Sequence, residues 1–148
     1  LAAALALGAE GVLLGTRFLA THEAPVPAVA KAAICAATEA DTVYTPIPDL
    51  VTRPEWLDVG AQSRAIRNRA VEEWLGREAE LGALDAASRQ QIASRWAQAR
   101  ADGRRNEMII LAGQDSGLIH EVLPAGEVVR RIVAEAEAIL RRLPASLG

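Results

Sequence analysis

The chain has 148 residues, which is enough for one domain with a substantial hydrophobic core. It is 51% hydrophobic and 3% aromatic, and its net charge of −3 comes with basic residues scattered among acids, which argues against nucleic-acid binding. No apolar run approaches the roughly 20 residues of a membrane helix, and the amino end lacks the basic region and cleavage site of a signal peptide.

An alanine-rich stretch opens the chain, and residues 1–7 favour a helix. Gly8 stands where such a helix would end, since glycine commonly follows the last helical turn. Neither a methionine nor a capping residue precedes Leu1, and the sole methionine is Met108. These features predict that the chain is the carboxyl-terminal part of a longer protein, or a cleaved chain.

The clearest chemical pattern lies just after this helix. Residues 12–14 form a short apolar run between glycines, which is typical of a parallel strand buried on both faces. Gly15 and Thr16 follow where that strand would end. Glycine lets the backbone approach a ligand closely, and a threonine hydroxyl can bond an oxygen atom. Exposed amides beyond a barrel strand often bind phosphate, so the pair is a candidate anion site; a tight turn without a ligand is the alternative.

Turn, helix and strand are predicted in the next segment. Residues 21–25 favour a turn, after which Pro27 opens a helix that runs to about Thr38. Cys35 lies in the alanine-rich part of this helix, and we interpret it as a small core residue rather than a reactive thiol. A single cysteine excludes an internal disulfide and fits a reducing compartment such as the cytoplasm. Residues 42–45 are rich in strand formers and predict a short strand.

Prolines mark the following segment, residues 46–60. They predict an ordered loop across the surface rather than a long regular element. A helix is predicted over residues 65–81, with Val71, Trp74 and Leu75 on its apolar face.

Charged residues begin that helix, because residues 64–68 read RAIRN. A solvated face with Asn68 as a local helix cap is the simplest interpretation. A further helix is predicted over residues 84–101, with Asp85 as its cap. Aromatic residues at helical spacing usually belong to a core, so three tryptophans are interpreted as packing residues: Trp56, Trp74 and Trp96.

A second polar loop follows a buried segment. Residues 108–112 are apolar without periodicity, which predicts burial as helix or strand. They lead into residues 113–117, where two glycines flank three polar side chains, a composition suited to close approach to a ligand. Gln114 is the candidate contact, by hydrogen bonding a ligand or closing over its pocket. A helix stop followed by a turn is the alternative.

The last predicted element is a long amphipathic helix. Pro124 stands at its entry, Glu127 lies in its first turn, and Pro144 is expected to end it. An apolar stripe along this helix predicts that it packs against a barrel wall or a helical partner. The stripe comprises Val128, Val129, Ile132, Val133, Ala136, Ile139, Leu140 and Leu143.

The sequence lacks the patterns of metal sites, of catalytic triads and of P-loops. His22 and His120 are far apart in sequence, with no further histidine or cysteine at ligand spacing, so no metal site is predicted. His120 is interpreted as a surface or packing histidine. No Ser-His-Asp arrangement and no P-loop lysine pattern occur.

Four segments together resemble one enzyme family. Residues 7–18, which read LGAEGVLLGTRF, look like the last-strand segment of the nitronate monooxygenases, also called 2-nitropropane dioxygenases. Residues 64–68 resemble an Arg-Ala-Leu-Arg-Asn run of that family. The Ala-Gly-Gln loop and its Gly-Leu-Ile continuation (residues 112–119) and the closing Leu-Pro-Ala-Gly-Glu helix (residues 123–127) match in the same order.

The resemblance implies an α/β fold: the carboxyl-terminal part of an FMN-dependent (β/α)8 TIM barrel, mostly helical here, with one clear barrel strand. It further implies one domain in three segments. Residues 1–45 would hold the last barrel unit, the FMN-phosphate loop and the following helix. Residues 46–107 would be a loop and helical cap, and residues 108–148 would carry the Ala-Gly-Gln loop and the closing helix.

In that family the Gly-Thr pair sits at the FMN phosphate, so Gly15 and Thr16, with Gln114 beside them, are the expected cofactor-binding residues. The implied reaction oxidises nitronates or nitroalkanes with dioxygen to a carbonyl compound and nitrite. The family's catalytic histidine lies in a glycine-rich motif that this chain lacks. No catalytic residue is therefore assigned here, and an amino-terminal remainder of the barrel is the expected partner.

Two alternatives stay open. One is an FMN-dependent enoyl thioester reductase of the related barrel family, and the other is a helical interaction module without catalysis. The sequence leaves the physiological substrate, the electron donor and homo-oligomerisation open. We expect the chain to fold poorly alone, because a lone barrel strand has unpaired edges.

Overall fold

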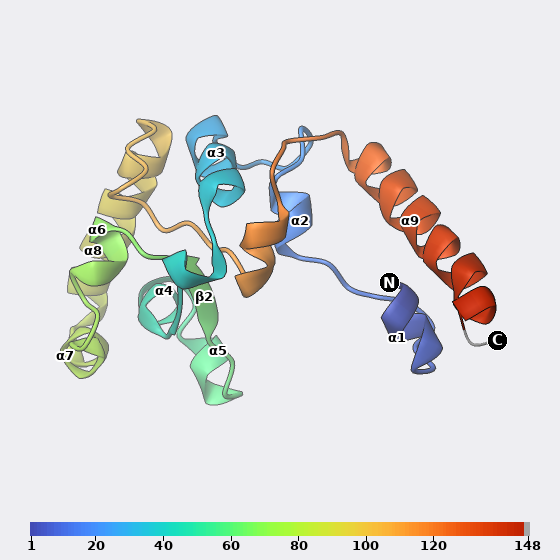
Figure 1. Ribbon diagram of the computed structural model, residues 1–148. Coiled ribbons are helices and arrows are strands. Elements are labelled where there is room, and N and C mark those ends of the chain that lie inside the picture. Colours follow the sequence, from blue (N-terminus) through green and yellow to red (C-terminus); the bar gives the residue numbers. More distant parts are fainter. Residues whose placement is uncertain (147–148) are drawn as a thin grey trace.

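The computed structural model describes residues 1–146 and is dominated by helices around one small sheet (Figure 1). The α-helices are α1 (Ala2–Ala6), α2 (Thr16–Leu19), α3 (Ala28–Ala36), α4 (Ile47–Thr52), α5 (Glu55–Asp58), α6 (Arg69–Glu72), α7 (Glu78–Ala83), α8 (Ala86–Ala101) and α9 (Ala125–Ser146). Two 3-10 turns, η1 (Glu39–Asp41) and η2 (Gln114–Leu118), and two strands, β1 (Thr42–Thr45) and β2 (Ser63–Ile66), complete the chain.

The sheet is built on β2 as its middle element. β1 pairs with β2 in antiparallel register, with Thr42 opposite Ile66 and Thr45 opposite Ser63. On the other edge of β2, the backbone N–H of Ile66 donates to the carbonyl of Ile110, and an antiparallel bridge forms between neighbouring residues. The predicted strand at residues 42–45 is confirmed, and the buried segment 108–112 lies alongside β2 as an extended chain.

Two apolar clusters flank this sheet. One gathers buried residues of α3 and of residues 108–112, including Ile34, Met108 and Ile110. The other joins α4, α6, α7 and α8 through buried residues such as Ile47 and Trp96. The sheet and its helices therefore form a body with its own core, as the composition predicts.

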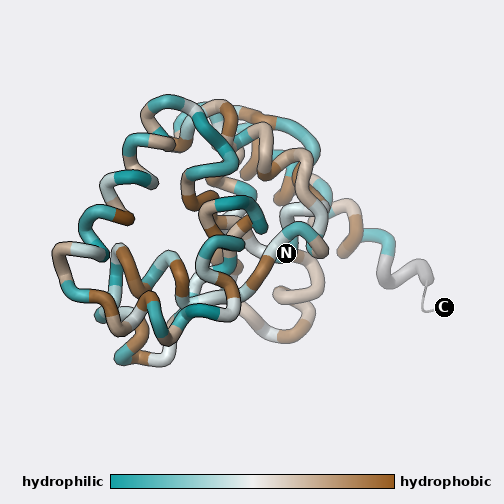
Figure 2. Tube along the Cα trace, turned by 90° about the vertical axis from the view of Figure 1, so that its left-hand side faces the viewer, coloured by the Kyte–Doolittle hydropathy of each residue, from teal (hydrophilic) through white to brown (hydrophobic). Residues whose placement is uncertain are grey.

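The two terminal helices stand apart from that body (Figure 1). α9 contacts α1 and α2, and α1 lies beside its carboxyl-terminal half. The alternation of hydrophilic and hydrophobic stretches toward the C-terminal end is visible in Figure 2. Of the predicted stripe, Val128 and Ala136 are buried, whereas Val129 and Val133 stay largely exposed. The side chain of Leu143 lies outside the described ones.

The chain after α2 and the chain before α9 lie next to each other. Thr21 and Leu123 form a parallel bridge, and the N–H of His22 donates to the Leu123 carbonyl at 3.0 Å. Just beyond, a carboxylate oxygen of Glu23 accepts from the N–H of Ala125 at 2.8 Å, which satisfies an amide at the start of α9.

Several helix boundaries agree with the sequence. Gly8 ends α1 in a left-handed conformation, with φ at 92°, which glycine adopts without steric cost. The side chain of Asp85 accepts from the N–H of Ser88 and caps α8, as predicted. Pro27 precedes α3, and Asn68 caps α6 by accepting from the N–H of Val71.

The strand expected at residues 12–14 is not formed. The segment crosses between α1 and α2 without a sheet partner in the described part of the chain, and Leu13 is fully exposed. A buried parallel strand takes hydrogen bonds from a neighbour on each side, so its sequence pattern alone cannot create it.

Two further expectations are wrong in the middle of the chain. Residues 46–60 are not a surface loop: Pro48 and Pro54 lie at the starts of α4 and α5, and Pro48 itself is buried. Proline suits a first helical turn because its missing N–H would lack a partner there. The helix expected over residues 65–81 is instead β2, α6 and α7, because strand pairing overrides the local helical pattern.

Smaller differences concern one aromatic residue and one helix end. Trp56 is 46% exposed beneath the guanidinium of Arg53, 4.3 Å from the ring centroid, so it is not a core residue. Trp96 is buried as expected. α9 continues to Ser146, and Pro144 therefore does not end it.

Candidate functional site

The structure brings together the two loops that carry the candidate residues. Thr16 opens α2, and its Oγ1 accepts a hydrogen bond from the backbone N–H of Gly113 at 2.9 Å. The two residues are 97 positions apart in sequence. Thr16 is 8% exposed, so this contact lies in a largely buried environment. The Gly-Thr loop and the Ala-Gly-Gln loop therefore form one continuous surface.

Gly113 fits this junction because it has no side chain. A Cβ atom built on Gly113 would lie 2.5 Å from Oδ1 of Asp115 and 3.1 Å from Oγ1 of Thr16. A larger residue here would have to displace the exposed Asp115 side chain and crowd the Thr16 hydroxyl, so the absence of a side chain suits this junction.

Gly15 has the opposite surroundings. A Cβ atom built there would meet no other atom within 4 Å, and Gly15 is exposed. The space over the Gly15 backbone is thus not filled by side chains of the described residues. An anion approaching this face would meet the exposed backbone of the Gly-Thr loop.

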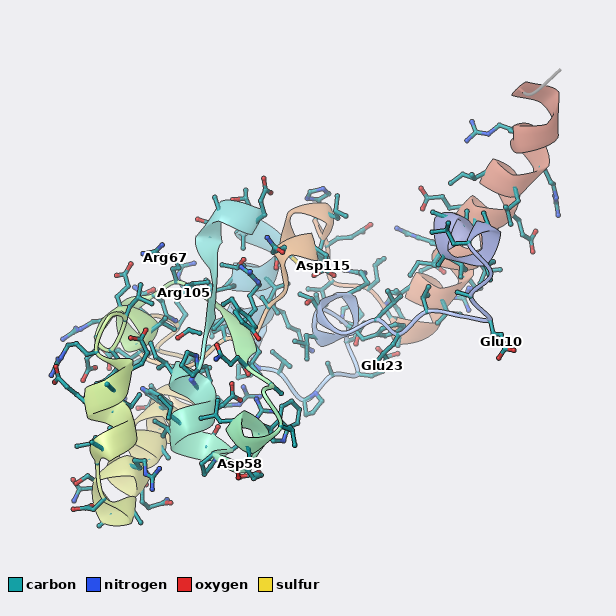
Figure 3. All side chains as sticks on the ribbon, turned by 90° about the horizontal axis from the view of Figure 1, so that it is seen from below. Glu10, Glu23, Asp58, Arg67, Arg105 and Asp115 are labelled. Atoms are coloured by element: carbon teal, nitrogen blue, oxygen red, sulfur yellow. The ribbon has the colours of Figure 1, made fainter. Side chains whose placement is uncertain are left out.

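The Ala-Gly-Gln loop is folded as η2, which begins at Gln114. The N–H and the side-chain Oγ of Ser116 both donate to the Gly113 carbonyl, the latter at 2.7 Å, and Ser116 is fully buried. Gln114 and Asp115 are exposed, and Asp115 lies on η2 beside α2 (Figure 3). The alternative of a helix stop followed by a turn is met only in part: η2 is a turn beside α2, but no helix precedes it, because residues 108–112 are not helical.

Arg17, the residue after Thr16, makes a contact with the segment that follows η2. Its Nη1 donates to the Glu121 carbonyl at 3.0 Å, while Nη2 is buried without a partner in the described structure. A carboxylate oxygen of Asp115 lies close to Gly113, 2.5 Å from the position of a Cβ atom built there.

The RAIRN run has a structural role at its last residue. Nδ2 of Asn68 donates to the carbonyls of Arg105 and Met108, at 3.0 and 2.9 Å, while its Oδ1 caps α6. The interpretation of Asn68 as a cap is confirmed. Arg67 and Arg105 lie side by side on a polar hollow of about 210 Å3, away from the Gly-Thr loop (Figure 3).

Both histidines border one shallow hollow on another face. His22 and His120 line it together with Cys35, although they are distant in sequence. Residues 1–146 contain no group of three or more His, Cys, Asp or Glu side chains that could hold a metal. Burial raises the pKa of the Cys35 thiol, which disfavours the reactive thiolate and agrees with a packing role.

Sequence reasoning did not anticipate the Thr16–Gly113 hydrogen bond. It singled out Gly15, Thr16 and Gln114 from two separate motifs, and only the fold shows that these motifs are neighbours. The order of glycines and polar residues in both loops was the available signal, but neither loop specifies its partner.

Comparison with known proteins gives one consistent family. Residues 1–135 match the family described as nitronate monooxygenase. A nitronate monooxygenase from Neurospora crassa is 28% identical over 145 residues, covering 96% of this chain and 36% of that protein. A putative monooxygenase from Mycobacterium tuberculosis is 48% identical over 62 residues. The chain thus spans little more than a third of the first of these relatives.

Solved structures agree in both fold and coverage. FabK from Thermotoga maritima superposes with a TM-score of 0.73 at 28% identity, over 98% of this chain and 42% of that one. A nitroalkane oxidase from Streptomyces ansochromogenes gives a TM-score of 0.70 at 30% identity, over 94% and 37%. No helix among residues 1–146 is both long and apolar enough to cross a membrane.

These neighbours are TIM-barrel enzymes, and the expected fold class, part of a (β/α)8 barrel, is confirmed. The family match covers most of the chain and includes both loops that meet at Thr16 and Gly113. The chain belongs to the nitronate monooxygenase family of flavin-type oxidoreductases.

Proposed function

We propose that this chain forms part of an FMN-dependent enzyme that oxidises nitronates or nitroalkanes with dioxygen, giving a carbonyl compound and nitrite. Gly15 and Thr16 would hold the FMN phosphate, and Gln114 would contact the cofactor from the neighbouring loop. The observation that carries this proposal is the hydrogen bond from Gly113 to Thr16, because it unites the two loops that the family resemblance assigns to the cofactor.

The described residues fit one side of a phosphate site. The backbone around Gly15 is open, and the Thr16 hydroxyl is fixed by the N–H of Gly113. Asp115 supplies no favourable charge for an anion. The fit therefore implies that cationic or further amide groups come from the rest of the barrel, which this chain does not include under the proposal.

FMN, when bound, would supply the electron chemistry with dioxygen. The contribution of this chain would be binding and orientation. Thr16 would fix the distance between the phosphate end and η2, and the exposed Gln114 amide would offer hydrogen bonds to the cofactor or substrate. The proton-abstracting base would lie outside the chain, since His22 and His120 both line the hollow on another face.

A pair of variants tests the phosphate contact. In the polypeptide that carries this chain within a complete barrel, Thr16→Val removes the hydroxyl at nearly constant volume, and Thr16→Ser keeps it. We expect Thr16→Val to lower FMN retained after dialysis about tenfold, as loss of a charge-assisted hydrogen bond would. Equal flavin content in both variants would count against the assignment.

The reaction needs its own measurement. Nitrite release and oxygen consumption with an alkyl nitronate should rise and fall together with flavin content.

The three-segment division at residues 45 and 107 stays a prediction, and limited proteolysis with mass spectrometry would show whether cleavage falls near these boundaries.

A second candidate is an FMN-dependent enoyl thioester reductase. The superposition on FabK, with a TM-score of 0.73, gives this candidate its support. It predicts NAD(P)H oxidation with a 2-enoyl thioester and no nitrite from nitronates. A helical interaction module is the remaining alternative, and it predicts a colourless protein whose barrel retains no flavin.

A further inference from the structure

An apolar cavity lies apart from the Thr16–Gly113 contact. It has a volume of about 450 Å3 and lies between α3, α4, α8 and the extended residues 108–111. Small-molecule sites typically have volumes of roughly 300–1,000 Å3, so this one is large enough for a ligand. Its apolar wall includes Ile34, Pro48, Trp96, Met108 and Ile110.

The wall is preformed by the two cores of the molecule. Ile34 and Met108 belong to the cluster around α3, whereas Trp96 belongs to the cluster around α8. Ile34, Pro48 and Met108 are less than 2% exposed. Because these side chains are anchored in packed clusters, the cavity surface is rigid, and a ligand would bind without first ordering its walls.

α8 presents a face of small side chains to the cavity. Ala93 and Ala97 line it at a spacing of one helical turn, with Trp96 between them and Arg100 one turn further on. Alanine at these positions leaves room beside the helix that a larger residue would fill. The same helix carries larger polar side chains, such as Gln90, away from the cavity.

The guanidinium groups of Arg53 and Arg100 line this cavity, and only one of them is paired with a carboxylate of the described residues. Arg53 is neutralised, because its Nη2 lies 3.1 Å from Oδ1 of the fully buried Asp49. Arg100 donates to the Pro25 carbonyl at 2.7 Å, and no carboxylate of residues 1–146 pairs with it. Arg100 therefore offers an unneutralised positive charge at the rim of an apolar cavity.

We propose that this cavity binds a small amphiphilic anion, with its alkyl chain against α8 and residues 108–111 and its carboxylate paired with Arg100. The apolar wall selects the chain, and the guanidinium selects the charged head. This inference is independent of the flavin proposal, because none of Gly15, Thr16 and Gln114 lines the cavity.

Fluorescence and calorimetry of the polypeptide that carries this chain within a complete barrel test the proposal directly. Trp96 lines the cavity, and the other two tryptophans, Trp56 and Trp74, do not. Hexanoate, decanoate and tetradecanoate are titrated below their micelle concentrations, with decanol as the uncharged probe. We expect decanoate to change the tryptophan emission and to bind about tenfold more tightly than decanol at low salt. Trp96→Phe should abolish the emission change while calorimetry still detects binding.

Matched variants of α8 separate the cavity from the surface. Ala97 and Ala101 are both exposed on α8, but only Ala97 lines the cavity, so Ala97→Phe fills it and Ala101→Phe adds the same ring elsewhere on the helix. Ala97→Phe should weaken decanoate binding at least tenfold, and Ala101→Phe should leave it unchanged. Circular dichroism of both variants establishes that each one is folded.

A second pair of variants tests the contact between the carboxylate and Arg100. Arg100→Gln should reduce decanoate affinity to that of decanol, whereas Arg89→Gln, on the same helix but away from the cavity, should not. The proposal is overturned if no probe binds, if both phenylalanine variants bind decanoate as the parent does, or if the two glutamine variants behave alike. Occupancy of the cavity by another segment of a longer polypeptide would appear as absence of binding there, which also overturns it.

Discussion

The backbone N–H of Gly113 donates to Oγ1 of Thr16 across 2.9 Å, and this bond joins the start of α2 to the start of η2. Thr16→Val would leave that buried N–H without an acceptor. We expect the free energy of unfolding to fall by about 1–3 kcal/mol, measured by urea denaturation. Thr16→Ser keeps the acceptor and should lose less than half of that amount. Equal losses would mean that the threonine methyl group, rather than the hydrogen bond, stabilises the junction.

Asn68 connects three segments, so its loss should be costly. Asn68→Ala removes the cap of α6 and both hydrogen bonds to the carbonyls of Arg105 and Met108. We expect a loss of about 2–4 kcal/mol in the free energy of unfolding. Asn106→Ala, an exposed position in the same link, is the control and should change stability little. A similar effect of both substitutions would contradict the role given to Asn68.

Asp49 is the fully buried carboxylate of the sheet body. It accepts from the N–H of Ser63 at 2.7 Å and from its Oγ at 2.9 Å, and it pairs with Arg53. Asp49→Ala would leave the guanidinium and the strand amide unpaired, so we expect a loss of about 3–5 kcal/mol by chemical denaturation. The exposed Asp58 provides the control, and Asp58→Ala should lie within about 0.5 kcal/mol of the parent.

Glu23 should make the start of α9 sensitive to acid. The hydrogen bond from the Ala125 N–H lowers the pKa of Glu23 below its ordinary value of 4.5. A lowered folded-state pKa stabilises the fold above the unfolded-state value, and this stabilisation is lost as pH falls through the lower one.

A pH series of urea midpoints measures this effect. Glu23→Gln keeps an acceptor oxygen but does not titrate, so its stability should depend less on pH below about 4.5 than that of the parent. Glu10→Gln, at an exposed position near α1, should retain the dependence of the parent (Figure 3). Identical pH profiles for all three proteins would show that the Glu23 contact does not form in solution.

Leu13 should drive self-association of the isolated chain. Its side chain is 100% exposed, and Leu7 nearby is 90% exposed, a pattern that favours association through apolar surface. Leu13→Lys should therefore reduce the average mass in sedimentation experiments at high concentration. Val59→Lys replaces a residue that is 80% exposed after α5 and serves as the control. If only the control reduces association, the surface near α5 is the contact instead.

Local patterns in the sequence were sufficient for elements that carry their own signals. The cap at Asp85, the stop at Gly8 and the apolar stripe of α9 each depend on residues within a few positions of one another. Residues 64–66 show the limit of such patterns. They look helical in isolation, yet they form β2 because backbone groups from two distant segments pair with them.

In the candidate site, too, local patterns predict the separate loops but not the contact between them. Glycine and polar residues identified each loop separately, through chemistry that a ligand would require. The contact between Thr16 and Gly113 depends on 97 positions of intervening chain, which no local pattern encodes. The apolar cavity likewise is assembled from four segments, so neither its volume nor the unpaired charge of Arg100 could be read from the sequence.

The bridge between Thr21 and Leu123 has a practical consequence for protein engineering. Residues 22–122 begin and end at neighbouring positions because Thr21 pairs with Leu123. This segment therefore has the geometry of a transplantable module. A segment from another barrel grafted onto the same two ends would also have to replace the N–H that Gly113 donates to Thr16 and the apolar contacts at the end of α2.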